Sequence, residues 1–165
     1  PRKGLLFTGF VQPEPKRIQR SCFMELTTQQ IQLIKRSWRS LHGIPQALIA
    51  DMFYSKLFAS NPRLRKLFPA DMDQQYRKLI DMLNRIVVQL DEPDALEQEI
   101  AWMAQRHAGY GVKPVHYTLV GNALLWTLER GLGKDWNEQT AEAWKGCYQK
   151  MAGAMRRSSQ YTTSS

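Results

Sequence analysis

The sequence predicts an all-α protein, and three observations lead to this prediction. Apolar residues recur at spacings of three and four along most of the chain, and no segment alternates apolar and polar residues with a period of two. Proline and glycine divide this pattern into segments of helical length. With 165 residues, 43% of them hydrophobic and 23% charged, the chain has the size and composition of one globular domain. We therefore expect about six to eight helices around a single core.

The two ends of the chain lack this helical pattern. Residues 1–23 contain three prolines and scattered charge, so we expect a flexible basic leader, either an upstream extension or an addition to the natural protein. Met24 would be a natural start for the domain, which we expect over residues 24–157. Residues 158–165 are polar and are expected to form a frayed tail.

The first two expected helices are separated by a glycine and a proline. Thr27 and Gln30 have the spacing of a capping box, and the helix that they begin should end near Gly43. Pro45 then lies at an early position of the second helix. The residues expected to face the core are Ile31, Ile34, Trp38 and Leu41 in the first helix and Ala47, Ala50, Tyr54, Leu57 and Phe58 in the second.

A short turn and a long amphipathic helix follow. The turn lies between Pro62 and Pro69 and is too brief to be stable alone, so it must pack against something larger. Asp71 and Asp73 precede the long helix, where acidic side chains favour a helix N-terminus. The apolar stripe of this helix is the clearest in the chain and comprises Tyr76, Leu79, Ile80, Leu83, Ile86, Val87 and Leu90.

Three further helices are expected after this one, with prolines or a capping side chain at their starts and glycines at the ends of the first two. The fourth helix should begin at Asp91, Glu92 and Pro93 and end at Gly109 and Gly111. The fifth should begin at Pro114 and end at Gly131 and Gly133, and Asn137 should cap the sixth. The inward stripes are Tyr117, Val120, Leu124 and Leu128 in the fifth helix and Ala141, Trp144, Tyr148, Met151 and Met155 in the sixth.

Charge, hydropathy and cysteine content exclude several classes of function. The net charge is +8, but half of it lies in residues 1–23, and the rest is interspersed with acidic residues, which argues against nucleic-acid binding. No apolar run is long enough to insert into a membrane. Cys22 and Cys147 are far apart and form no disulfide framework, which favours a reducing, cytoplasmic location.

His107 is the leading candidate for a metal ligand. It continues the apolar stripe of Leu96, Ile100 and Met103 at spacings of four, three and four, which places the imidazole on the buried face of its helix. Neutral imidazole is the commonest metal ligand in proteins, and one histidine on an inner helix face can hold haem iron. The alternative is a core histidine whose ring bonds a backbone carbonyl, and periodicity alone favours this alternative.

Four strings change that balance, because together they resemble the bacterial globins, both the single-domain haemoglobins and the globin part of flavohaemoglobins. They run from Met52 to Phe58, from Asn61 to Phe68, from Arg106 to Pro114, and from His116 to Gly121. The resemblance covers residues 25 to about 157. It implies a globin fold around haem b, which is iron protoporphyrin IX, with His107 as the axial ligand of the iron.

The resemblance also implies the remaining site residues. Phe68 would stack on the haem, Tyr54, Gln75 and Leu79 would line the side where gas binds, and Tyr117 and Val112 would complete the pocket. A tyrosine hydroxyl and a glutamine amide can each donate a hydrogen bond to bound dioxygen, which predicts slow oxygen release. From the residues alone, Tyr54 could instead bond a carbonyl in the core, Gln75 could be exposed, and Gln74 or Tyr76 could reach inward.

In one respect the chain departs from flavohaemoglobins. In those proteins, a tyrosine equivalent to Tyr117 joins a glutamate in bonding the proximal histidine. Counted from Trp144, the place of that glutamate falls near residues 158–160 of this chain, which contain no carboxylate. The departure weakens the case for peroxidase-like chemistry. We expect a backbone carbonyl near Met103 or Ala104 to bond the imidazole instead.

The expected function is reversible binding of dioxygen and other diatomic gases, as in oxygen transport. Whether the protein is also an enzyme stays open, and the alternative function is nitric oxide dioxygenation. The electrons for that reaction would have to come from a separate reductase, because the chain contains no glycine-rich dinucleotide loop and ends after about one domain. A third possibility is gas or redox sensing, with the basic leader as a contact. A haem-free helical protein would require the matching strings to be coincidental. We expect a monomer or a weak homodimer.

Overall fold

The computed structural model describes residues 26–161, and side chains up to residue 157. Within this range all regular structure is helical, which confirms the all-α prediction. The elements are α1 (Thr28–Ser40), η1 (Leu41–Gly43), α2 (Gln46–Ser60), η2 (Pro62–Leu67), α3 (Asp73–Gln89), α4 (Pro93–Ala108), α5 (Pro114–Leu132), η3 (Gly133–Asp135) and α6 (Glu138–Tyr161). The expected leader, residues 1–23, lies outside the described residues, and α6 continues four residues into the segment expected as a tail.

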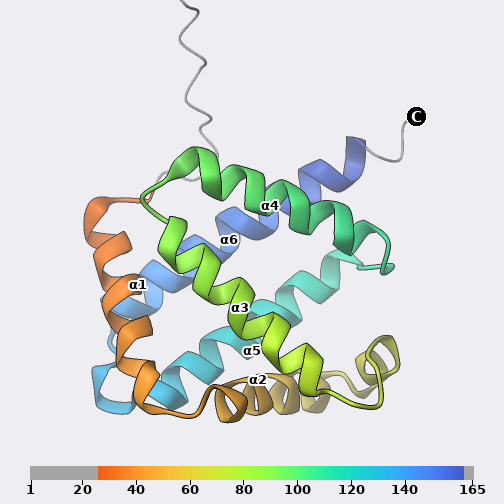
Figure 1. Ribbon diagram of the computed structural model, residues 1–165, viewed down its shortest axis with the longest axis horizontal. Helices are drawn as coiled ribbons and strands as arrows, with labels where there is room; N and C mark the ends of the chain where they lie inside the picture. The colour runs from red at the N-terminus through yellow and green to blue at the C-terminus, as the bar shows by residue number, and fades with distance from the viewer. Residues whose placement is uncertain (1–25, 162–165) are drawn as a thin grey trace, which may run out of the picture.

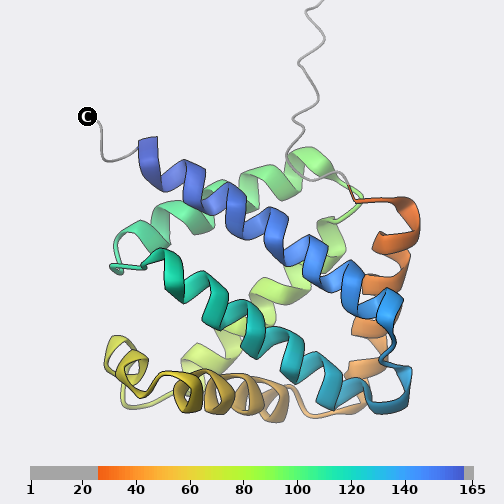
Figure 2. The ribbon, with the colours of Figure 1, turned by 180° about the vertical axis from the view of Figure 1, so that it is seen from behind.

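The helices pack in two crossed layers. In Figure 1, α3 runs diagonally in front of α5 and α6, and the reverse view in Figure 2 shows α5 and α6 side by side. α2 packs against both α3 and α5, while α4 packs against α3 and α6. This arrangement brings the long amphipathic helix α3 between the helix that carries Tyr54 and the helix that carries His107.

Side chains cap several helices where the sequence indicates. The capping box of α1 is complete, because Thr27 Oγ1 accepts from the Gln30 amide at 3.1 Å and Gln30 Oε1 accepts from the Thr27 amide at 3.0 Å. Asn137 Oδ1 accepts from the Thr140 amide at 3.0 Å at the start of α6. The predicted starts of these two helices are confirmed.

One local expectation was wrong, and a second is confirmed only in part. Ala47 is exposed, and the buried set of α2 includes Ile49 and Phe53 instead, because this helix packs against two neighbours and buries more than one narrow stripe. Of the two glycines expected to end the fifth helix, Gly131 lies inside α5, whereas Gly133 is its C-cap, directly after Leu132. Gly133 has φ 53°, a left-handed conformation that a residue with a side chain adopts only with strain.

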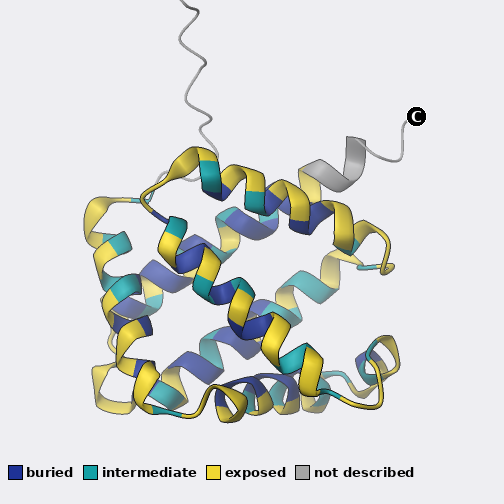
Figure 3. Cartoon of the chain, viewed as in Figure 1, coloured by how far each residue is buried: buried dark blue, intermediate teal, exposed yellow. Residues whose placement is uncertain are grey.

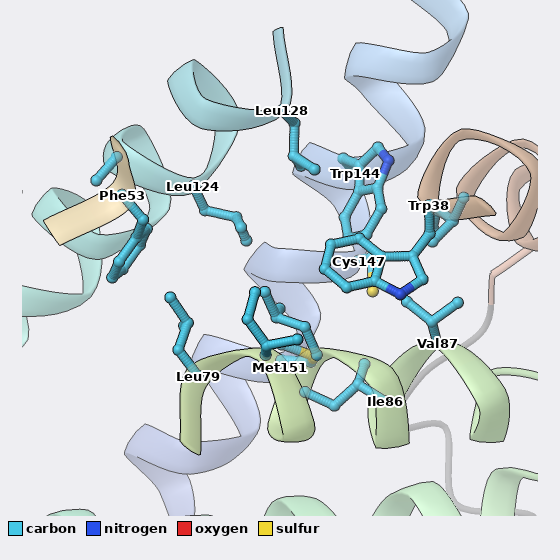
Figure 4. Close-up of a cluster of buried hydrophobic side chains, with 14 of the residues drawn as sticks. Trp38, Phe53, Leu79, Ile86, Val87, Leu124, Leu128, Trp144, Cys147 and Met151 are labelled. Carbon is cyan, nitrogen blue, oxygen red and sulfur yellow. The ribbon is translucent and has the colours of Figure 1, made fainter. Parts of the chain in front are cut away.

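The core contains a pair of buried tryptophans whose polar atoms are satisfied. In Figure 3 the buried faces of the helices turn inward, and Figure 4 shows Trp38 and Trp144 together, with ring centroids 6.1 Å apart. Trp38 Nε1 donates to Asn84 at 2.8 Å, and Trp144 Nε1 donates to Ser37 at 2.9 Å. Cys147 lies beside them, and burial raises the pKa of its thiol to about 12.

Candidate functional site

An apolar pocket lies among α2, η2, α3, α4, α5 and α6, and its cavity volume is about 160 Å³. Four of the seven predicted site residues line it: Phe68, His107, Val112 and Tyr117. Phe68 precedes His107 by 39 residues, so the fold assembles the pocket from parts that are distant in sequence.

His107 lies in the last turn of α4 and is half-buried. Its Nδ1 lies 2.7 Å from the carbonyl oxygen of Met103, as predicted. Because a carbonyl oxygen can only accept a hydrogen bond, Nδ1 must carry the proton in this pair. The neutral ring then has its lone pair on Nε2, which is the form of imidazole that binds a metal ion.

Tyr117 and Tyr148 form the part of the pocket wall between α5 and α6. The Tyr148 hydroxyl donates to the backbone carbonyl of Tyr117, and burial raises the pKa of that hydroxyl. The Tyr148 ring lies so close to Gly121 that a Cβ atom there would be 2.4 Å from Cε1 of the ring. Gly121 is therefore what allows the Tyr148 ring to reach this position.

Tyr54 lies outside the lining of this pocket and packs behind it. Its ring meets Phe68 edge-on, with centroids 5.5 Å apart, and Phe68 lines the pocket. Burial raises the pKa of Tyr54 to about 12, and a side-chain hydrogen bond with Gln75 opposes that rise. A glutamine amide can donate to the phenol oxygen, and the phenol proton can then be donated elsewhere.

The structure separates the three candidates for the inward-facing residue at the start of α3. Gln74 is exposed, whereas Gln75 is half-buried and bonds Tyr54. Tyr76 stacks its ring on Tyr54 but directs its hydroxyl to Asp51, 2.6 Å away on α2. Gln75 is therefore the polar side chain that reaches the buried aromatic group.

Leu79 lies in the main core and not in the pocket wall. In Figure 4 it points toward Phe53 and Leu124, and its side chain is buried. The residue of α3 that lines the pocket is Met82, three positions further along the helix. The difference is one of rotation, since α3 turns Leu79 toward α2 and α5 and Met82 toward the pocket.

Sequence reasoning missed two other polar side chains of the pocket, His116 and Tyr148. His116 lies in the first turn of α5, where its Nδ1 accepts from the Lys113 amide at 3.1 Å. A residue in a first helical turn has little periodic signal of its own, but its place two residues after Pro114 in a matching string could have drawn attention to it. Tyr148 was assigned to the core stripe of the last helix.

The chain matches a family model described as Globin over residues 51–155. A neuroglobin from Tetraodon nigroviridis is 26% identical over 149 residues, which are 81% of this chain and 92% of that protein. A flavohemoprotein from Bordetella pertussis is 30% identical over 103 residues, 61% of this chain and 26% of that protein. The chain thus spans about a quarter of the length of this flavohemoprotein.

Solved structures give the same result. A bacterial globin from Campylobacter jejuni aligns with a TM-score of 0.72 at 22% identity and covers 84% of this chain and 100% of its own. An engineered carbene transferase, derived from a candidate nitric oxide dioxygenase of Rhodothermus marinus, aligns with a TM-score of 0.73 at 31% identity and covers 84% of this chain and 97% of its own. The chain belongs to the globin family, and the predicted globin fold is confirmed.

Globins and flavohemoproteins bind haem, so the family accounts for an apolar pocket in a small helical protein. Among the residues that the structure describes, none of the helices is long and apolar enough to cross a membrane.

Proposed function

We propose that this globin binds haem b through His107 and reversibly binds dioxygen and other diatomic gases. The observation that carries the proposal is the bond between His107 Nδ1 and the Met103 carbonyl, because it places a ring proton on Nδ1 and leaves Nε2 as the ring nitrogen for a metal ion in an apolar pocket. Bound haem would supply an iron atom that takes up and releases a gas molecule.

The other pocket residues fit a large flat apolar cofactor. Phe68 and Val112 offer apolar surface beside His107, and Met82 offers a flexible apolar side chain from α3. Tyr117 is half-buried, and burial raises the pKa of its hydroxyl, so the ring remains neutral against the cofactor. None of these side chains brings a charge into the pocket.

Tyr54 and Gln75 support the gas-binding part of the proposal. The Tyr54 phenol is held in its neutral form by burial, and the Gln75 amide, which bonds it, can donate to its oxygen. The phenol proton can then be donated to a bound gas molecule that carries partial negative charge, as dioxygen does. We propose that this donor slows oxygen release.

The visible absorption spectrum tests the proposal directly. Purified protein is compared as the oxidised, dithionite-reduced and oxygen-exposed forms, after haem addition if needed. We expect a Soret band, a five-coordinate reduced form and a stable change on exposure to oxygen. A protein that shows no haem band after reconstitution would refute the assignment, and a six-coordinate reduced form would replace reversible gas binding with a redox or sensing role.

Nitric oxide dioxygenation is a second candidate, favoured by the Tyr54 and Gln75 pair and by the flavohemoprotein and candidate dioxygenase among the similar proteins. It requires a reductase to restore the iron after each turnover. A rapid single reaction with nitric oxide does not test it, because most oxygen-loaded globins react in this way. Sustained nitrate production with a cellular reductase would support it, and its failure with several reductases would exclude it.

A further inference from the structure

We propose that Tyr76 is a positioning residue, which holds Tyr54 and Gln75 in place for gas binding through its tie to Asp51. The inference rests on the proposed function, since it concerns how the donors of that function are fixed. It differs from a direct role, because the Tyr76 hydroxyl is directed away from Tyr54 and toward the surface of α2.

The first support is the bond between Tyr76 and Asp51. The Tyr76 hydroxyl donates to Asp51 Oδ1 at 2.6 Å, a short distance typical of a hydroxyl bonded to a carboxylate. This bond and the Asp51 charge raise the pKa of Tyr76 to about 12, so the hydroxyl remains a donor at physiological pH. The bond joins α2 to the first turn of α3.

The second support is the stack between the two tyrosine rings. The rings of Tyr54 and Tyr76 are nearly parallel, at 11°, with centroids 5.6 Å apart. Asp51 precedes Tyr54 by three residues on α2, and Gln75 precedes Tyr76 by one residue on α3. Two bonds therefore cross between the same two helices, and the stacked rings lie between them. Moving Tyr76 would therefore disturb the ring stacked on Tyr54 and also the adjacent residue, Gln75, that bonds the Tyr54 phenol.

The third support is the exposed outer side of the Tyr76 side chain. This side borders a cleft of about 550 Å³, also lined by Gln46 and Asp73. The backbone at the start of α3 is capped separately, since Asp71 Oδ1 accepts from the Asp73 amide at 2.9 Å. The Tyr76 side chain is held by its bond to Asp51 and by its stack on the Tyr54 ring.

The test uses three variants of the haem-loaded protein. Tyr76→Phe keeps the stacked ring and removes the hydroxyl, Asp51→Ala removes the acceptor, and Asp51→Asn keeps an acceptor oxygen. We expect several-fold faster dioxygen dissociation in the first two, with little change in association, and a rate near that of the wild type in Asp51→Asn. The carbon monoxide stretching frequency should shift in the first two, because it reports the donor near the bound gas.

Arg85→Gln is the matched control. It breaks the exposed pair of Arg85 with Glu99, 2.9 Å long, which ties α3 to α4 at the surface. It should leave gas dissociation unchanged. If it accelerates dissociation as much as Tyr76→Phe does, general loosening of α3 explains the effect and the positioning role is refuted. A change confined to association would also refute it and indicate a gate.

Two further measurements separate this inference from the proposed function. If Tyr54→Phe leaves dissociation unchanged, the donor role of Tyr54 fails; if Tyr54→Phe accelerates it and Tyr76→Phe does not, only the positioning role fails. Hydrogen exchange of the amides in residues 73–78, measured with and without haem, gives a readout independent of gas binding. Exchange should be faster in Tyr76→Phe in both states, and unchanged exchange would contradict the inference.

Discussion

The two sides of the candidate site are held by different kinds of hydrogen bond. On the side of α4, α5 and α6, polar side chains bond backbone carbonyls, as His107 does with Met103 and Tyr148 with Tyr117. On the side of α2 and α3, side chains bond side chains, as Tyr76 does with Asp51. The first arrangement depends on the identity of one residue in each pair, because the acceptor is backbone, whereas the second depends on the identity of both residues. Gas-binding properties can therefore change by substitution on the α2 and α3 side without changing the fold.

The largest expected effect comes from removing the anchor of the first side. His107→Ala should lose haem or bind it loosely, and the protein should lose the stability that a bound cofactor contributes by mass action. His116→Ala is the matched control, because His116 lines the same pocket. Haem titration and thermal unfolding measure both. A normal axial-histidine spectrum in His107→Ala would show that another residue holds the iron.

The next effect tests the second side. Tyr54→Phe removes one donor at a buried site, where a hydrogen bond to a ligand contributes about 1–3 kcal/mol. Dioxygen release, followed by stopped-flow spectroscopy, should then accelerate by roughly 5- to 140-fold, since 1.4 kcal/mol corresponds to a factor of ten. An unchanged rate would place the Tyr54 hydroxyl away from the gas.

An added methyl group at Gly121 should disturb the α5 and α6 side of the site by steric overlap, without removing a hydrogen-bonding group. Gly121→Ala would place a Cβ atom 2.4 Å from the Tyr148 ring, and such overpacking typically costs about 1–3 kcal/mol. Part of that cost is offset by the better helix propensity of alanine, about 1 kcal/mol. Chemical denaturation of Gly121→Ala and of Gly146→Ala gives the comparison, because a Cβ atom at Gly146 meets nothing within 4 Å. Equal stability of the two variants would contradict the close packing.

The smallest expected effect appears at alkaline pH. The pKa of Tyr54 is about 12 in the folded protein, above the ordinary value of 10 that applies to the unfolded chain. The neutral phenol is therefore favoured by folding, and its contribution to stability is fully present below pH 10 and is lost as pH rises toward 12. The difference in unfolding free energy between wild type and Tyr54→Phe should shrink across this interval. A constant difference would indicate that the phenol is not buried in the folded state.

Features with local causes could be predicted from the sequence. The capping box at Thr27, the cap at Asn137 and the apolar stripe that leads to His107 depend only on residues a few positions apart. The bond of His107 to Met103 also lies within one helical turn. These features were predicted because they need no knowledge of how the helices cross.

Features that depend on the crossing of helices could not be predicted in this way. Asp51 and Tyr76 are 25 residues apart and meet only because α2 and α3 pack together. A modest rotation of α3 decides whether Leu79 or Met82 faces the pocket, and a repeat of 3.6 residues does not fix that angle. His116 joins the pocket because of where α5 begins, a position that only the assembled fold defines.

The rate at which Cys147 reacts with a thiol reagent would measure how often the core of this fold opens. Alkylating reagents attack the thiolate, and burial raises the pKa of Cys147 to about 12 while 2% of the residue is exposed, so the closed protein protects it twice. In a Cys22→Ser background, each labelling event would therefore record one opening of the core in which Cys147 becomes exposed to solvent. Comparing the labelling rate with and without haem would show how much cofactor binding slows these openings.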